Sequence, residues 1–287
     1  MKRTLFPLFI FLVFFLFLFP GISEETDDPW YLPLDPGFEN YAPDPAAFSE
    51  KGYHDESLSI VLEERDMKGN RFVIARIQLK SPTQLRTAIA GAPNEDVTAL
   101  PSSMGRKLHA VLTLNGENYT HRDRLSFVYR QGQELRGCVT PERDVLVIDR
   151  EGTFHIFLKE EKEYSLSEFM EDDISILQAF SFGPALIKNG EVVPERRNYG
   201  YYPDKNTWRT FIAQDGPLSY LFVISSGGTH QELAAFAATL GVENAYNLDG
   251  GYSSVMLLGD RYLGSRSKSK ERAQSDILYI VTAVPDR

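Results

Sequence analysis

The sequence predicts a single α+β domain in which a mixed, largely buried β-sheet packs against a few helices. Segments of strand length, either apolar throughout or alternating between apolar and polar residues, recur from residue 53 to the end of the 287-residue chain. Only two segments have the spacing of a helix. Strands and helices do not follow a strict βαβ alternation, and this mixture favours an α+β arrangement without a second domain.

The first half of this domain is predicted as strands joined by short turns. Ser57–Glu63 and Arg71–Gln78 alternate as half-buried strands do, with Lys68-Gly69-Asn70 as the turn between them. Leu166–Phe180 has helical spacing. The other predicted strands are Ala110–Leu114, the hairpin Asp144–Ile148 with Thr153–Leu158, and the hairpin Ala185–Ile187 with Glu191–Val193 around Lys188-Asn189-Gly190.

The second half contains a helix between strands. Thr229 is a plausible N-cap for an apolar helix from Gln231 to Leu240, and Gly241 can end that helix. Short apolar runs on both sides of it read as strands. The predicted strands are Phe211–Ala213, Tyr220–Ile224, Ala245–Leu248, Ser254–Leu258 and Asp276–Val284.

The N-terminal residues 1–23 have the pattern of a secretory signal peptide. Two basic residues precede an apolar run from Leu5 to Phe19, and small residues follow it. As a helix this run would be about 22 Å long, whereas the hydrocarbon core of a bilayer is about 30 Å thick. A cleaved signal is therefore favoured over an anchor, and we expect a secreted or cell-envelope-associated protein.

Residues 24–52 are rich in proline and acidic residues, and we expect an extended spacer or a segment wrapped on the domain surface. Trp30, Tyr31 and Phe38 suggest that part of this spacer docks on the domain. The remaining residues, 53–287, form the predicted domain. Cys138 is the only cysteine, so no intrachain disulfide can form.

The charge of the chain argues against nucleic acid as a partner. The formal net charge is −10, and it becomes −12 without residues 1–23, which carry two basic and no acidic residues. A largely acidic surface repels phosphate backbones. A small or neutral carbohydrate is accommodated more readily, and membrane contact is expected only through the N-terminal segment.

The segment Asn247–Met256 (NLDGGYSSVM) has the strongest pattern for chemistry. A strand places Asp249 at its end, and Gly250 and Gly251 allow the backbone to turn sharply and approach a ligand closely. Hydroxyl groups follow at Ser253 and Ser254. This set suits a sugar hydroxyl, a leaving-group oxygen or a cation, although an ordinary turn capped by Asp249 explains it equally well.

Two other segments carry candidate residues. Leu112–Thr120 (LTLNGENYT) ends a strand at Asn115 and Gly116, and Glu117 could be the second carboxylate that glycosidic cleavage usually requires. In Thr207–Thr210 (TWRT), Arg209 could hold a phosphate or carboxylate in a bidentate manner, although a salt bridge at the edge of the core explains it as well.

Two further polar residues give weaker signals. Arg272 lies in the basic run Arg261–Arg272, which is usually a solvated loop but is also the best local candidate for attracting an anion. For His230, a surface polar residue at the helix start is favoured over a general base.

Taken in order, several segments resemble the phosphodiester glycosidase family. They are QLRTAIAG, AVLTLNGENY, SFGPALIKNGEVV, WRT, ELAAFAATLGVENAYNLDGGYSSVM and ERAQSDILYIV. The resemblance covers about Tyr53 to Val284. It implies an α+β catalytic domain acting on a sugar linked through phosphate or a related leaving group.

The resemblance implies pocket residues at Asn115, Arg209, Asn247, Asp249, Gly250, Gly251, Ser253 and Ser254, and the segments described above add Glu117, Thr210 and Arg272 to the candidate site. Asp249, Glu117 and Arg209 are the expected catalytic residues. The expected substrate-binding residues are Asn115, Thr210, Asn247, Gly250, Gly251, Ser253, Ser254 and Arg272. Where the family usually has a third glycine, this chain has Tyr252.

Three functions follow from these observations. The first is an exported glycoside hydrolase-like enzyme that cleaves a sugar-1-phosphodiester or related linkage in cell-envelope or exopolysaccharide metabolism, without a metal or cofactor. The second is a non-catalytic glycan-binding or matrix protein, in which Tyr252, Tyr119 and Trp208 stack on sugars. The third, a hydrolase using Ca²⁺ at Asp249, is disfavoured because carboxylates are sparse around it in the sequence.

Overall fold

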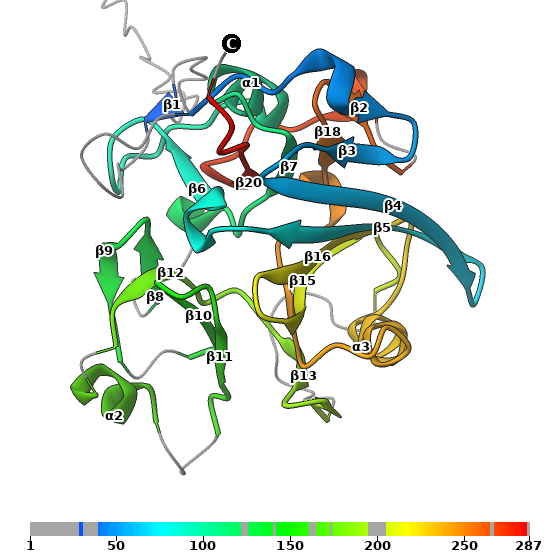
Figure 1. The fold of residues 1–287 in the computed structure, drawn as a ribbon. Coiled ribbons are helices and arrows are strands. Elements are labelled where there is room, and N and C mark those ends of the chain that lie inside the picture. The colour runs from blue at the N-terminus through cyan, green and yellow to red at the C-terminus, as the bar shows by residue number, and fades with distance from the viewer. Residues whose placement is uncertain are drawn as a thin grey trace, which may run out of the picture.

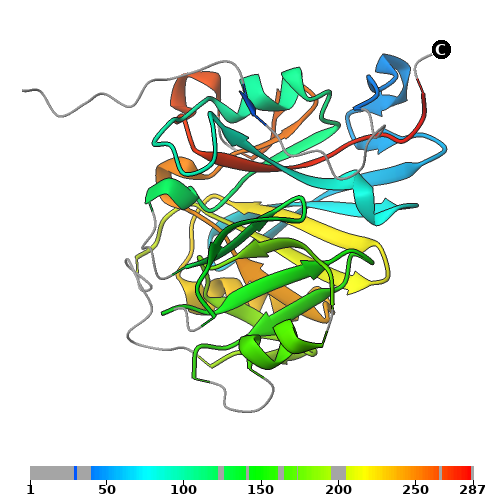
Figure 2. The ribbon, with the colours of Figure 1, turned by 90° about the vertical axis from the view of Figure 1, so that its left-hand side faces the viewer.

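The computed structural model describes residues 29–30, 40–121, 126–139, 142–160, 165–172, 174–194, 205–264 and 267–285. Its strands form three sheets that meet around one core, as the two views in Figures 1 and 2 show. Every strand pair in these residues is antiparallel. The predicted signal segment, residues 1–23, lies outside the described residues.

The largest sheet has nine strands and includes the strands on both sides of Asp249. Its order is β14-β13-β17-β15-β16-β5-β4-β3-β2. In that order the strands are Glu191–Val192, Ala185–Lys188, Asn244–Asn247, Arg209–Gly216, Ser219–Ser225, Asn70–Leu79, Leu58–Met67, Gly52–His54 and Phe48–Ser49.

A second sheet of six strands, in the order β1-β6-β20-β7-β18-β19, includes strands from both ends of the described chain. They are Pro29–Trp30, Leu85–Ala90, Asp276–Ile280, Leu112–Asn115, Met256–Leu258 and Arg261–Tyr262. The third sheet has five strands, in the order β11-β10-β12-β8-β9. They are Phe154–Phe157, Val145–Asp149, Ile176–Phe180, Phe127–Arg130 and Gln133–Gly137.

Each sheet carries one α-helix on its outer face (Figure 1). Helix α3 (His230–Ala238) packs on the nine-stranded sheet, α1 (Pro101–Lys107) on the six-stranded sheet and α2 (Leu166–Glu171) on the five-stranded sheet. Short 3₁₀ turns complete the structure at Pro45–Ala47, Pro82–Gln84, Tyr119–His121, Gly251–Ser253 and Lys268–Lys270.

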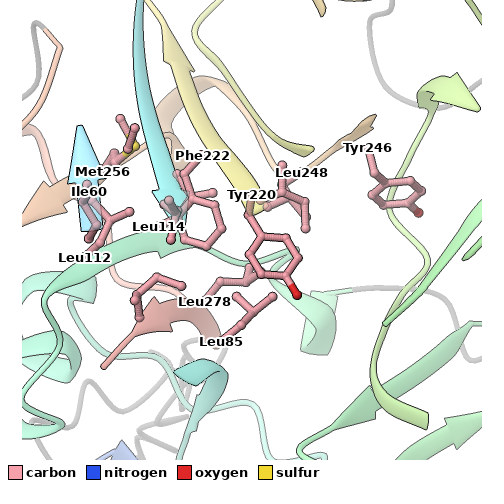
Figure 3. Packing of buried hydrophobic residues seen from close by; sticks show 14 of the residues in the cluster. Ile60, Leu85, Leu112, Leu114, Tyr220, Phe222, Tyr246, Leu248, Met256 and Leu278 are labelled. Atoms are coloured by element: carbon pink, nitrogen blue, oxygen red, sulfur yellow. The ribbon is translucent and has the colours of Figure 1, made fainter. Parts of the chain in front are cut away.

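The central core lies where the inner faces of the three sheets meet (Figure 3). Successive residues of a strand point to opposite faces. On β16, for example, Phe222 faces the central core whereas Val223 faces α3. Because both faces of the inner strands are buried, these strands read in the sequence as apolar runs rather than as clear alternations.

The predicted fold class is correct only in part. Strands predominate strongly in the described residues, and three antiparallel sheets replace the single mixed sheet that the sequence suggested. The predicted hairpins are confirmed as β4–β5, β10–β11 and β13–β14. The predicted helix after Thr229 is confirmed as α3, with Thr229 as its N-cap.

The predicted helix Leu166–Phe180 is wrong in its second half. Ser165 and Glu168 form a capping box that starts α2, but α2 ends at Glu171. Ile176–Phe180 is instead strand β12, all five residues of which are buried, between β10 and β8. A short apolar run has no periodicity that separates a buried strand from a helix, so pairing with β10 decides its conformation.

The N-terminal spacer contributes two described segments to the sheets. The backbone of Pro29–Trp30 pairs with β6, which agrees with docking of this part of the spacer. Phe48–Ser49 pairs with β3, so the large sheet begins within residues 24–52. Among the residues searched, no helix has the length and hydrophobicity needed to span a bilayer.

The central core generates a prediction for stability. Leu278 on β20 is fully buried among residues from all three sheets. Leu278→Ala should lower the free energy of unfolding by about 2–5 kcal/mol, because it leaves a cavity in a close-packed core. Val192→Ala, at a side chain that is 49% exposed, should change it by less than about 0.5 kcal/mol. Chemical denaturation measures both, and equal effects would contradict this description of the core.

Candidate functional site

The candidate site lies where loops from two sheets meet at Asp249. Asp249 follows β17, and its backbone carbonyl accepts hydrogen bonds from Asn115 Nδ2 (2.8 Å), at the end of β7, and from Thr210 Oγ1 (2.9 Å) on β15. Its backbone amide donates to Gly116 O at 3.4 Å. The backbone of Asp249 is therefore held from both sides, while its carboxylate remains partly exposed.

The two glycines after Asp249 allow close approach of neighbouring groups. A Cβ atom at Gly250 would lie 2.9 Å from Trp208 O and 3.4 Å from Arg209 Cδ, closer than a side chain tolerates at the carbonyl. Gly251 has a φ of 63° and donates from its amide to Trp208 O at 2.7 Å. These glycines bring the Asp249 loop against Arg209.

Arg209 is the cation of the site. It is 5% exposed, and its guanidinium donates to Gly228 O, Lys205 O and the ring of His230. Burial lowers the pKa of Arg209 to about 10, an effect that the nearby Asp249 partly offsets. A guanidinium presents several hydrogen-bond donors in a fixed planar geometry, and this one is well suited to bind an anion.

His230 is buried rather than at the surface, which corrects the expectation from the sequence. It is 7% exposed, and its Nε2 lies 3.0 Å from Arg209 Nη1. Burial, followed by the charges of Arg209 and Arg143, lowers the pKa of His230 to about 3. The imidazole is therefore neutral at physiological pH.

Arg143 belongs to the same positively charged region, although no pattern in the sequence pointed to it. Its Nη1 donates to Phe182 O at 3.1 Å, and its guanidinium lies 5.9 Å from the ring of Phe182. Arg143 is isolated in the sequence from every motif named above, so only the fold places its charge near His230.

Glu117 does not occupy the position expected for a second catalytic carboxylate. It is fully buried, and its two oxygens accept from Arg130 Nη2 (2.7 Å) and from the Ser181 amide (2.9 Å). The same Arg130 nitrogen donates to Asp276 at 2.7 Å. A buried carboxylate paired in this way argues against proton exchange with a substrate, so we interpret Glu117 as structural.

Several expected substrate-binding residues lie beneath the surface. Asn247, Ser253 and Ser254 are at most 1% exposed, as are Asn115 and Thr210. Asn115 uses its amide to join two loops, and its Oδ1 accepts from the Val255 amide at 3.1 Å. These residues support the loops around Asp249. Arg272 is exposed, and no hydrogen bond or ion pair in the described structure links it to the site.

The three aromatic residues proposed as stacking platforms differ in exposure. Tyr252, in the 3₁₀ turn after Gly250, is 80% exposed. Trp208 is half-buried against the central core. Tyr119 is fully buried, and its hydroxyl accepts from the Asn94 amide at 3.1 Å, so it cannot stack on a ligand.

Two surface hollows lie away from these residues. One of about 670 Å³ is lined by Phe48, Arg106 and Arg261 among others, and one of about 480 Å³ by Tyr53, Asp55 and Thr282 among others. Neither includes Asp249 or Arg209. We place the candidate site at Asp249 because buried charged and polar groups converge there, whereas the charged side chains that line the larger hollow are exposed to solvent.

Comparison with known proteins agrees with the resemblance seen in the sequence. A model of the phosphodiester glycosidase family matches residues 109–281, more than half of the chain. A search of curated protein sequences finds no match.

Two solved structures share the fold. The zebrafish N-acetylglucosamine-1-phosphodiester alpha-N-acetylglucosaminidase catalytic domain, auto-inhibited by its pro-peptide, matches with a TM-score of 0.60 and 19% identity, over 85% of this chain and 87% of that chain. A hypothetical protein from Synechocystis matches with a TM-score of 0.58 and 16% identity, over 79% and 62% of the two chains.

The structural interpretation of Glu117 generates a prediction. Glu117→Gln should lower the free energy of unfolding by about 3–5 kcal/mol, because it removes one charge from a buried ion-pair cluster. Chemical denaturation measures this loss, and Glu134→Gln, at an edge-strand position, is the control. Unchanged stability of the Glu117→Gln variant would contradict the structural role.

The low pKa of His230 generates a prediction of pH dependence. Between about pH 6.5 and 3 the unfolded chain binds a proton at His230 and the folded chain does not, so stability falls as the pH falls. Lowering the pH from 7 to 4 should therefore reduce the free energy of unfolding of the wild type by about 3 kcal/mol more than that of a His230→Gln variant. Denaturation of both proteins at pH 7 and pH 4 measures the difference, and parallel pH dependences would contradict it.

Proposed function

Since the chain belongs to the phosphodiester glycosidase family, we propose that it hydrolyses a sugar-1-phosphodiester or a related glycan linkage. The observation that carries this proposal is the pairing of a partly exposed carboxylate, Asp249, with a buried guanidinium, Arg209, across a glycine turn. The two charges are close enough for Asp249 to raise the pKa of Arg209 against the effect of burial.

In this proposal Arg209 stabilises the phosphate side of the scissile bond. Ordinary glycosides need a general acid because their leaving group is a poorly stabilised alkoxide. A phosphate leaves as a stable anion, so a fixed cation can do the work that the acid does elsewhere. The burial of Glu117 is compatible with such a substrate, because no second carboxylate is then needed to protonate the leaving group.

Asp249 acts on the sugar side. Its backbone is held by Asn115, Thr210 and Gly116, so its carboxylate has a defined position at the surface. From there it can stabilise positive charge developing on the sugar ring or activate a water molecule. Asn247, Ser253 and Ser254 support this loop from below.

The proposal also includes a substrate class and a cellular location for the protein. The zebrafish enzyme is named for an N-acetylglucosamine-1-phosphodiester, which makes that compound class the first to test. The N-terminal basic and apolar pattern supports export, and with it a role in cell-envelope or exopolysaccharide metabolism. The acidic composition supports a small carbohydrate or sugar-phosphate partner rather than nucleic acid.

One observation favours a second candidate function, a non-catalytic glycan-binding protein. Tyr252 stands where the family usually has glycine, and its ring is 80% exposed beside the site. An exposed aromatic ring can stack on the apolar face of a sugar. Binding of glycans that Tyr252→Ala weakens, without release of any product, would support this function over hydrolysis.

Hydrolysis generates a direct prediction. The protein should release free sugar from members of a panel of sugar-1-phosphodiesters, and Asp249→Asn should lower kcat by at least about 100-fold, because it removes the charge that stabilises the transition state. Arg209→Gln should lower kcat/KM similarly, whereas Arg272→Gln, at an exposed position, should have little effect. Sugar release that Asp249→Asn leaves unchanged would refute the proposed mechanism.

A further inference from the structure

The larger surface hollow, of about 670 Å³, has the size of a small-molecule binding site. Three segments that are distant in the sequence line it: the residues around β2, the end of α1 with the loop after it, and the turn between β18 and β19 (Figure 1). The hollow lies at the opposite end of β18 from the Asp249 loop, because Leu258 lines the hollow whereas Val255 contacts Asn115. It is therefore separate from the candidate site described above.

Two of the three walls of the hollow are joined by direct contacts. Gly259 has a φ of 54° and turns the chain between β18 and β19, and its amide donates to Val111 O at 2.8 Å. A Cβ atom there would lie 3.2 Å from Cε1 of Phe48, so this turn packs on the Phe48 ring. Arg261 Nη2 donates to Glu50 O at 2.9 Å and ties the turn to the residues after β2. A site whose walls are already fixed binds a ligand at a lower entropic cost.

Apolar rings form one part of the lining. Phe48 is partly exposed, and its ring meets that of Tyr53 edge to face with 4.7 Å between centroids, which fixes its orientation. Pro43 and Pro45 also line the hollow with their rings partly or fully exposed. A fixed aromatic ring provides a surface on which the apolar face of a sugar can pack.

The charged side chains of the lining balance one another. The carboxylates of Glu50 and Asp260 and the guanidinium groups of Arg106 and Arg261 all line the hollow at exposed positions. The chain as a whole has a formal net charge of −10, so the hollow is less acidic than the average surface. Balanced charges favour neither an anion nor a cation, and a neutral polar ligand suits them best.

These charged groups keep hydrogen-bonding capacity for a ligand. Arg106 Nε lies 3.2 Å from Asp260 Oδ1, but the two side chains are 60% and 73% exposed, so this ion pair is weak. Arg261 donates to backbone carbonyls, and within the described residues the Glu50 carboxylate makes no hydrogen bond or ion pair. Donors and acceptors are both available, and a sugar needs both because each hydroxyl group donates and accepts.

Other classes of ligand fit this lining less well. A phosphate group would be repelled by the carboxylates of Glu50 and Asp260. A proline-rich peptide docks in grooves lined by aromatic rings, whereas the lining of this hollow contains Phe48 and the imidazole of His109. A wholly apolar ligand would remove water from four charged groups without replacing their hydrogen bonds.

We propose that this hollow is a second carbohydrate site, which binds a neutral oligosaccharide. The C–H face of a sugar ring packs on Phe48, and its hydroxyl groups bond to Glu50 and Arg261. This inference goes beyond the proposed hydrolysis, because binding here requires neither Asp249 nor Arg209. On a polymeric glycan, such a site holds the protein in place independently of any reaction at Asp249.

The first experiment locates the binding. Chitotetraose, cellotetraose and maltotetraose are neutral oligosaccharides of different linkage and composition. In ¹⁵N-labelled protein, at least one of them should shift the backbone amide signals of Phe48, His109 and Asp260 in a saturable manner. Shifts confined to the Asp249 loop, or no saturable shift with any of the three sugars, would overturn the proposal.

The second experiment compares two exposed glutamates of the same N-terminal segment. Glu50 lines the larger hollow and Glu56 the smaller one. Glu50→Ala should raise the dissociation constant of the bound oligosaccharide about tenfold, because a charged acceptor is lost. Glu56→Ala should change it by less than about twofold. Equal effects of the two substitutions would place the binding elsewhere and overturn the assignment.

Competition with inorganic phosphate tests the charge of the ligand. Phosphate should not displace the oligosaccharide, and raising the salt concentration should change the dissociation constant little, because a neutral ligand is not screened. Displacement by phosphate would identify an anion site and overturn the proposal.

The Asp249→Asn variant separates this site from the proposed reaction. Its amide shifts at the hollow and its dissociation constant for the oligosaccharide should equal those of the wild type. Loss of binding in this variant would place the oligosaccharide at Asp249 and overturn the second site. Binding at the hollow without sugar release from any phosphodiester would support the second site while counting against hydrolysis. Sugar release without binding at the hollow would do the reverse.

Discussion

The buried guanidinium of Arg130 is the interaction on which the arrangement of the sheets around the site depends. It lies on β8 of the five-stranded sheet and binds Asp276 on β20 of the six-stranded sheet, together with Glu117 after β7. Burial disfavours its charge, but Asp276 and Glu117 outweigh that effect and raise the pKa of Arg130. Charges removed from water in this way are tolerated only when they are closely paired, so the two sheets are constrained to one relative position.

This constraint reaches the candidate site through a short chain of contacts. Asp276 accepts hydrogen bonds from the amides of Glu117 and Asn118, and a side chain at Gly116 would collide with its carboxylate. The loop so held presents Gly116 O to the amide of Asp249. The cluster of Arg130, Glu117 and Asp276 therefore acts on the site indirectly. It fixes the position of the loop that binds the backbone of Asp249, the residue whose carboxylate faces the site.

The contrast between the two buried arginines explains their different roles. Arg130 is neutralised by two carboxylates at 2.7 Å and has no charge left for a ligand. Arg209 donates to two carbonyls and a neutral imidazole, and burial lowers its pKa to about 10. A buried cation with a perturbed pKa is a candidate functional group.

The sequence alone determined the local features, because turns, caps and contiguous motifs depend on neighbours in the chain. These features are the hairpins β4–β5, β10–β11 and β13–β14, the Thr229 cap of α3 and the strand end at Asp249. The contiguous motifs also identified the family. Only the tertiary structure decided that Ile176–Phe180 is a strand, that Glu117 pairs with Arg130, and that His230 and Arg143 lie beside Arg209. These outcomes depend on which distant residues share a low-dielectric interior, where pairing and burial outweigh local preference.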